Sequence, residues 1–175
     1  MHRSTFASVA IAALFAVPAL AAPPKMLSVT EKVTINAPAT KVWDAVKNYD
    51  ALPSWHPGFA KDEIVKGENN KVGAVRQLTI KDGPTFTEEL LAFSEKAKSY
   101  KYKIIESPLP IDAYSSTLTV KSVGKNKSQI VWNGTFKRKN ADANPPEGES
   151  DAGVSKLIHG VYRGGLDNVK SMTEK

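Results

Sequence analysis

The feature that most constrains the fold is a long amphipathic helical pattern that closes the chain after a nearly unbroken series of strand-like segments. From Ala152 onward, apolar residues recur at helical spacing: Val154, Leu157, Ile158, Val161, Leu166, Val169 and Met172. Such a helix needs another element on which to bury its apolar stripe. We therefore expect an α+β fold in which a curved antiparallel sheet of about seven strands wraps on this helix.

The strands are indicated by alternation of apolar and polar residues. In the first, residues 28–37, Val29, Glu31, Val33 and Ile35 share one face. A helix is expected next, beginning near Pro38, with a second short helical turn over "DALPSWHP". Six more strands are expected at residues 60–68, 72–80, 85–94, 99–107, 114–123 and 128–139.

The chain begins like a secreted protein. A basic start precedes an apolar run and the small-residue site Ala19-Leu20-Ala21. The run is shorter than the about 20 apolar residues that cross a bilayer. We predict a signal peptide at residues 1–21, a single mature domain at residues 22–175 without a membrane span, and a periplasmic location. An uncleaved anchor is the alternative.

Composition narrows the chemistry. The chain has no Cys, which excludes disulfides, thiol catalysis and Cys-based metal sites. It has no paired His motif, nucleophile elbow or phosphate-binding loop, so we assign no catalytic residue, metal or cofactor. The formal net charge of +6 favours acidic partners. Export argues against nucleic acid, and the alternating "KSYKYK" is typical of a half-solvated strand.

Two charged residues are predicted on apolar strand faces. Arg76 alternates with Leu78, and Glu88 lies two residues before Leu90 in the following strand. Because an unpaired buried charge is costly, we expect an Arg–Glu pair across these strands. The pair is either functional or purely structural, and a shift of one residue in register would reverse both faces.

The segment "ALPSWHPGF" holds two further candidates, Trp55 and His56. Pro53 and Pro57 stiffen it by fixing φ. We consider two interpretations: a lid over one mouth of a cavity, with His56 at the rim, or a well-packed corner. Tyr114 and Ser116 complete the candidates, either as hydroxyls inside a cavity or as ordinary strand residues.

Several stretches resemble a known superfamily. The order of elements, with "APATKVWDAV", "VGAVRQLTI", "EELLAF" and "GVYRGGLDNVK", resembles the polyketide cyclase/dehydrase-like branch of the START-like, or SRPBCC, superfamily. The leader, "WHPGFAK" and "AYSSTLTV" resemble the MxaD family of periplasmic accessory proteins of bacterial methanol oxidation. Plant hormone receptors of this fold carry a pocket Glu and a "YSS" stretch, matched here by Glu88, Tyr114 and Ser116, but "KDGPT" replaces their longer gate loop.

The resemblance implies a helix-grip fold with a hydrophobic cavity under the last helix. It implies a non-enzymatic accessory protein whose partner is a quinoprotein alcohol dehydrogenase or its cytochrome, with a small hydrophobic ligand as a further expectation. The alternative is a ligand carrier or a cyclase-like enzyme. Cyclase chemistry would need a positioned acid or base, for which Glu88, His56 and Tyr114 are the candidates.

Overall fold

The computed structural model describes residues 23–175, so the predicted leader lies outside the described residues. Its elements are β1 (Leu27–Ile35), α1 (Ala39–Val46), the 3₁₀ turn η1 (Leu52–Ser54), β2 (Phe59–Lys66), β3 (Val75–Ile80), β4 (Thr85–Ser94), β5 (Ser99–Glu106), β6 (Ile111–Gly124), β7 (Lys127–Arg138), η2 (Glu147–Glu149) and α2 (Asp151–Thr173). Within residues 23–175, no helix combines the length and apolar character that a membrane crossing requires.

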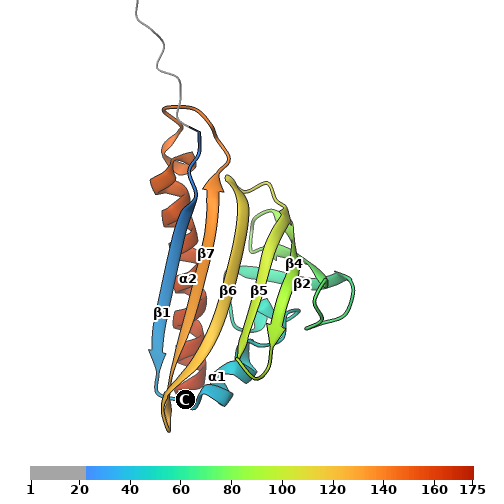
Figure 1. The fold of residues 1–175 in the computed structure, drawn as a ribbon, viewed down its shortest axis with the longest axis vertical. Coiled ribbons are helices and arrows are strands. Elements are labelled where there is room, and N and C mark those ends of the chain that lie inside the picture. Colours follow the sequence, from blue (N-terminus) through green and yellow to red (C-terminus); the bar gives the residue numbers. More distant parts are fainter. Residues whose placement is uncertain (1–22) are drawn as a thin grey trace, which may run out of the picture.

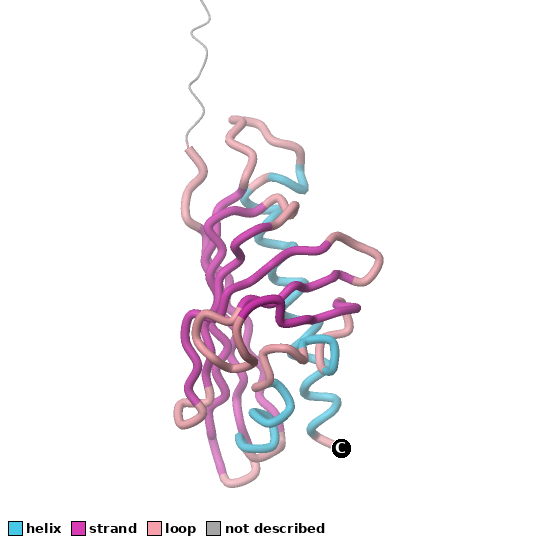
Figure 2. The backbone as a smooth tube through the Cα atoms, turned by 90° about the vertical axis from the view of Figure 1, so that its right-hand side faces the viewer, coloured by secondary structure: helices cyan, strands magenta, loops and turns pink. Residues whose placement is uncertain are grey.

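The seven strands form one antiparallel sheet in the order β1-β7-β6-β5-β4-β3-β2. Helix α2 runs along one face of the sheet, and α1 lies at its lower end (Figure 1). Figure 2, turned by 90°, shows that the sheet is curved. The strands nearest the viewer extend toward the side of the sheet on which α2 lies. The predicted helix-grip fold, with two short helical segments after the first strand, is confirmed.

The first strand shows how the alternation produces the core. β1 pairs with β7, and Val29, Val33 and Ile35 are buried on the face toward α2. Glu31 shares that face and accepts a hydrogen bond from the His159 side chain of α2 at 2.6 Å. The polar residues between them point to the opposite face. β1 and α2 therefore pack through buried apolar side chains and are also linked by the hydrogen bond between Glu31 and His159.

Helix α2 begins at the N-cap Ser150, whose hydroxyl accepts a hydrogen bond from the Gly153 N–H at 3.0 Å. Its buried stripe is Val154, Ile158, Tyr162, Gly165, Leu166, Val169 and Thr173. The predicted stripe was wrong at Leu157 and Met172, which are 39% and 40% exposed. Both residues lie on the flanks of the helix, where helical spacing alone does not separate the core from its margin.

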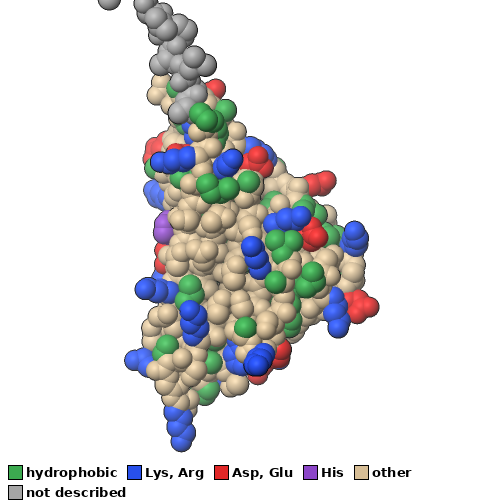
Figure 3. All heavy atoms as spheres, in the orientation of Figure 1, with side chains coloured by type: hydrophobic (Ala, Val, Ile, Leu, Met, Phe, Trp, Pro, Cys, Tyr) green, Lys and Arg blue, Asp and Glu red, His purple; other side chains and the backbone are tan. Residues whose placement is uncertain are grey.

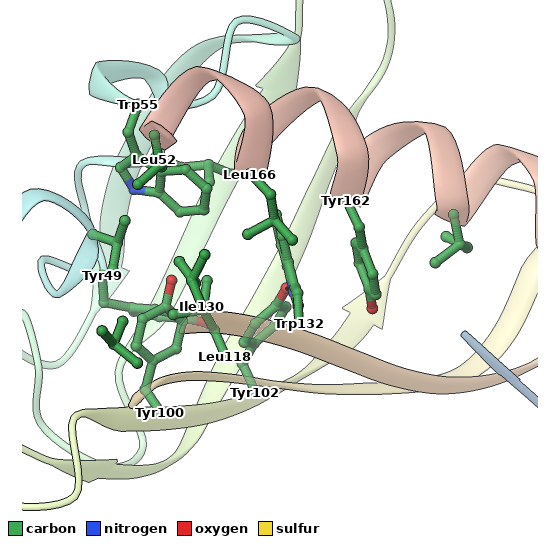
Figure 4. Packing of buried hydrophobic residues seen from close by; sticks show 14 of the residues in the cluster. Tyr49, Leu52, Trp55, Tyr100, Tyr102, Leu118, Ile130, Trp132, Tyr162 and Leu166 are labelled. Atoms are coloured by element: carbon green, nitrogen blue, oxygen red, sulfur yellow. Dashed lines mark hydrogen bonds between the residues drawn. The ribbon is translucent and has the colours of Figure 1, made fainter. Parts of the chain in front are cut away.

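One glycine sets the distance between α2 and the preceding loop. A Cβ atom at Gly165 would lie 2.5 Å from His56 Cδ2 and 3.0 Å from Trp55 Cζ3. The two rings therefore pack directly on the helix backbone, and Trp132 reaches the same point from β7. Figure 4 shows Trp55 above the core and Tyr162 beside Trp132, whose rings stack at 4.4 Å.

Candidate functional site

A small cavity lies between the sheet and α2. Its volume is about 60 Å³, which is room for about two water molecules. Most of its wall is apolar and comes from η1, six strands, the β5–β6 connection and α2: Leu52, Phe59, Leu78, Ile80, Phe86, Ile104, Leu109, Ile111, Trp132, Leu157, Ile158 and Val161. The polar lining residues are Arg76, Glu88, Tyr102 and Tyr114. The cavity therefore combines an apolar wall with a few polar groups, as small-molecule sites do.

An open groove of about 750 Å³ adjoins this cavity, between α2 and the start of β2. Phe59, Ile80, Leu157 and Val161 line both spaces, so these side chains separate the groove from the cavity. Gly160 of α2 also borders the groove, and nothing lies within 4 Å of its Cβ position. A molecule that enters the cavity from the groove has to pass these four side chains.

Arg76 and Glu88 meet at the polar end of the cavity. They are directly opposite each other in the β3–β4 register. Arg76 donates to Glu88 Oε2 from Nη2 at 2.6 Å and from Nε at 2.9 Å. The structure thus contains the cross-strand pair anticipated from the alternation, and both side chains are buried.

A third charged residue, Asp62, joins this pair. Arg76 Nη1 donates to Asp62 Oδ2 at 3.2 Å and to the Tyr49 carbonyl at 2.6 Å. The guanidinium also lies 4.1 Å from the centre of the Tyr49 ring, within cation–π range. Sequence reasoning missed Asp62, although it shares a face of β2 with Ile64 by period-two alternation.

Two carboxyl groups therefore share one guanidinium. Burial raises the pKa of Glu88 to about 7, the Arg76 charge opposes that rise, and the Asp62 charge adds to it. Burial also raises the pKa of Asp62. Glu88 Oε2 accepts both hydrogen bonds that Arg76 donates to this carboxylate. Its other oxygen, Oε1, receives no hydrogen bond from any residue in the described part of the chain. Oε1 is the polar atom that this end of the cavity offers to a ligand.

The two predicted hydroxyls, Tyr114 and Ser116, belong to a chain of hydrogen bonds with a definite direction. Ser116 O–H donates to the Asn133 carbonyl at 2.8 Å. The Tyr162 hydroxyl therefore donates to Ser116 Oγ at 3.0 Å, and Tyr114 donates to Tyr162 at 2.7 Å. Burial is the main cause that raises the pKa of Tyr162 to about 12, so this hydroxyl stays protonated at neutral pH.

Tyr102 stands at the cavity end of this chain. Its hydroxyl accepts from Trp132 Nε1–H at 3.0 Å, and its only other hydroxyl neighbour in the described structure is Tyr114, at 3.5 Å. Burial raises its pKa well above the ordinary value. The only acceptor for the Tyr102 O–H in the described structure is therefore Tyr114, and that hydrogen bond is long and weak. The O–H can donate to a ligand instead. Sequence reasoning placed Tyr102 on one face of a strand but did not identify it or Tyr162 as site residues.

In the segment around Trp55, the tryptophan side chain is packed into the interior, as the corner interpretation expects. Trp55 is 1% exposed, contacts Trp132 at 5.5 Å between ring centres, and lines neither the cavity nor the groove. His56 borders the groove, where its Nδ1 accepts from Gly58 N–H at 3.0 Å. Its Nε2–H therefore donates to the Val161 carbonyl at 2.8 Å. Burial lowers the pKa of His56, so the ring is neutral and joins the corner to α2.

No group of three or more His, Asp or Glu side chains in residues 23–175 is arranged to hold a metal ion. The carboxyl groups of Glu88 and Asp62 lie close together, but both accept hydrogen bonds from the Arg76 guanidinium.

Comparison with known proteins agrees with this architecture. The family profile described as "Polyketide cyclase / dehydrase and lipid transport" matches residues 26–174. The solved structure of the protein XoxI from Bacillus cereus is 29% identical, with a TM-score of 0.73, and the match covers 83% of this chain and 94% of that one.

Two more distant matches show the fold in other settings. The Zhui aromatase/cyclase from a Streptomyces species is 19% identical with a TM-score of 0.69, over 86% of this chain and 94% of that one. The abscisic acid receptor PYL10 of Arabidopsis thaliana is 24% identical over 81% of this chain and 76% of its own length.

Proposed function

The chain belongs to the polyketide cyclase / dehydrase and lipid transport family, and we propose that it binds a small, largely apolar molecule in the cavity beneath α2. The observation that carries this proposal is the mostly apolar wall, in which Glu88 and Tyr102 are polar residues with hydrogen-bonding capacity left for a ligand. A few fixed polar groups in an apolar wall orient a ligand, while the wall supplies most of the buried area.

We favour binding over turnover because two of the three acid–base candidates are engaged elsewhere. Both nitrogens of His56 are hydrogen-bonded to backbone groups, and Tyr114 donates to Tyr162. Of the three, only Glu88 remains, and burial raises the pKa of the neighbouring Tyr102 hydroxyl so far that it is a poor acid.

A cyclase-like enzyme is the second candidate, and one observation favours it. A cavity carboxyl whose pKa is raised to about 7 is suited to general acid–base work near neutral pH. Incubation with a linear polyketide mimic distinguishes the candidates. Saturable turnover that Glu88→Gln abolishes would establish the enzyme and overturn the proposal of binding alone.

We further propose a periplasmic accessory role beside a quinoprotein alcohol dehydrogenase or its cytochrome. The support is the leader-like start, the resemblance to MxaD-family proteins and the positive charge. Five lysines lie on the outer face of the sheet, each next in sequence to a residue that is buried on the opposite face. They are Lys32, Lys101, Lys103, Lys121 and Lys137. The space-filling view of this face shows more Lys and Arg than Asp and Glu (Figure 3).

We predict that this sheet face binds an acidic partner in a salt-dependent manner. The double variant Lys101→Glu/Lys121→Glu should weaken binding at least about tenfold at low salt, since steering charges act over about 10 Å at 0.1 M ionic strength. Titration of the dehydrogenase and the cytochrome at about 20 mM and about 200 mM salt is the measurement.

Lys156→Glu provides the control, because Lys156 is an exposed residue of α2 at the groove. It should leave affinity nearly unchanged. Equal affinity at both salt concentrations, or equal weakening by the control, would rule out the sheet face as the docking surface.

A further inference from the structure

We propose that the polar end of the cavity is a hydroxyl-recognition site, so that the bound molecule is a small neutral alcohol. This inference rests on the proposed ligand-binding function and names the chemistry of the ligand. It is carried by two atoms of the cavity wall, Glu88 Oε1 and the Tyr102 hydroxyl, whose hydrogen-bonding capacity the described protein leaves unused or weakly used.

The two groups have opposite requirements. Above its pKa of about 7, Glu88 is ionised and can only accept a hydrogen bond, and its Oε1 lacks a donor among the described residues although the residue is only 4% exposed. Tyr102 already accepts from Trp132 Nε1–H, so its unsatisfied capacity is that of a donor. A ligand group that meets both must donate and accept at once.

The register places these groups close together. Leu90 is opposite Tyr102 and Glu88 is opposite Ile104, so Glu88 and Tyr102 are diagonal neighbours on β4 and β5. The Glu88 charge also contributes to raising the pKa of Tyr102, as expected for nearby groups. One hydroxyl between them can donate to Glu88 and accept from Tyr102.

Other ligand groups meet these requirements less well. A carboxylate has no donor, and it would approach two carboxyl groups that share one guanidinium. Four of the five Arg76 N–H groups already donate to Glu88, Asp62 and the Tyr49 carbonyl, so Arg76 offers little to an anion. An ammonium group carries three donors and would bury at least one without an acceptor. A halide or hydrocarbon leaves Glu88 Oε1 unpaired.

The cavity also limits the size of the ligand. A volume of about 60 Å³ corresponds to about two or three non-hydrogen atoms, since a cavity of about 150 Å³ holds the six of benzene. A longer tail could pass between Phe59 and Leu157 into the open groove. So few atoms bound in the cavity imply weak affinity, in about the millimolar range.

The indole N–H of Trp132 provides a direct reporter, because it donates to the Tyr102 hydroxyl that would contact the ligand. The chain has three Trp, so three indole signals appear in a nitrogen–proton NMR spectrum, and Trp132→Phe assigns the relevant one. The probes are 1-butanol, propionate, n-butylammonium and 1-chlorobutane, which are similar in size. We expect saturable shifts with 1-butanol and at least about tenfold weaker binding of the other three.

Variants test whether the two groups cause this preference. Tyr102→Phe and Glu88→Gln should each reduce the advantage of 1-butanol over 1-chlorobutane about tenfold. Tyr100→Phe is the matched control: it removes a hydroxyl from the same strand as Tyr102, but Tyr100 does not line the cavity. It should leave the preference unchanged.

Each contrary outcome has a distinct meaning. Propionate or butylammonium binding as tightly as 1-butanol would overturn the hydroxyl assignment and leave the ligand-binding function standing. Equal binding of 1-chlorobutane would do the same, because the polar end would then make no contribution. If none of the four probes binds in the cavity, both the inference and the proposed function fail.

Discussion

Replacement of Arg76 by methionine should lower the free energy of unfolding by about 3–5 kcal/mol, because it leaves buried carboxyl groups without their cation. Arg76 is 2% exposed and donates to both Glu88 and Asp62, while its stem lies among apolar residues. Methionine keeps most of the apolar volume and removes the charge. Urea denaturation followed by circular dichroism measures the loss.

The buried Glu88 also makes the stability of the protein depend on pH. Glu88 holds its proton more tightly in the folded protein, with a pKa of about 7 against an ordinary value of 4.5. The free energy of unfolding therefore falls as pH rises between these values, since the folded state binds more protons than the unfolded state. Without Arg76 the pKa of Glu88 rises further, so the fall should extend to higher pH.

The triple variant Arg76→Met/Asp62→Asn/Glu88→Gln provides the control. It removes all three charges and should recover part of the lost stability, because neutral groups cost less to bury than unpaired charges. A loss below about 1 kcal/mol for Arg76→Met alone would contradict this account of the cluster, since that value is typical of exposed ion pairs.

Truncation of Trp55 to alanine should be nearly as costly, at about 3–5 kcal/mol. Its indole is almost fully buried against Trp132 and the backbone at Gly165, and its carbonyl accepts from Asn168 Nδ2 at 2.9 Å. The truncation would leave a void that the fixed backbone of α2 cannot fill. Trp55→Phe keeps an aromatic ring and should cost clearly less.

A second readout separates the corner from a lid. Because Trp55 lines neither the cavity nor the groove, the rate of 1-butanol exchange should stay within about twofold in Trp55→Phe. A small loss of stability in Trp55→Ala, together with much faster exchange in both variants, would instead identify a lid.

The strand positions, the last helix and the burial of Arg76 and Glu88 followed from period-two and helical spacing, because those patterns report which face a residue occupies. They do not report which distant residue lies opposite. Asp62 reaches Arg76 from β2, and Tyr162 reaches Tyr114 from α2, so both were missed.

Leu157 shows the same limit in another way. It has the helical spacing of a core residue, yet it lies where the cavity meets the groove and stays partly exposed. Spacing along a helix cannot show where the facing sheet ends. The direction of the hydroxyl chain likewise depended on the Asn133 carbonyl, a backbone group that no sequence pattern marks.

The central claim is that the space beneath α2 is a real apolar cavity that accepts a molecule. Diffraction from crystals of the protein under xenon pressure tests it most directly, because xenon enters preformed apolar cavities. The account predicts a xenon atom between Phe86, Leu78 and Trp132 in the cavity wall. Xenon in the outer groove alone, with the space between those three side chains closed, would contradict it.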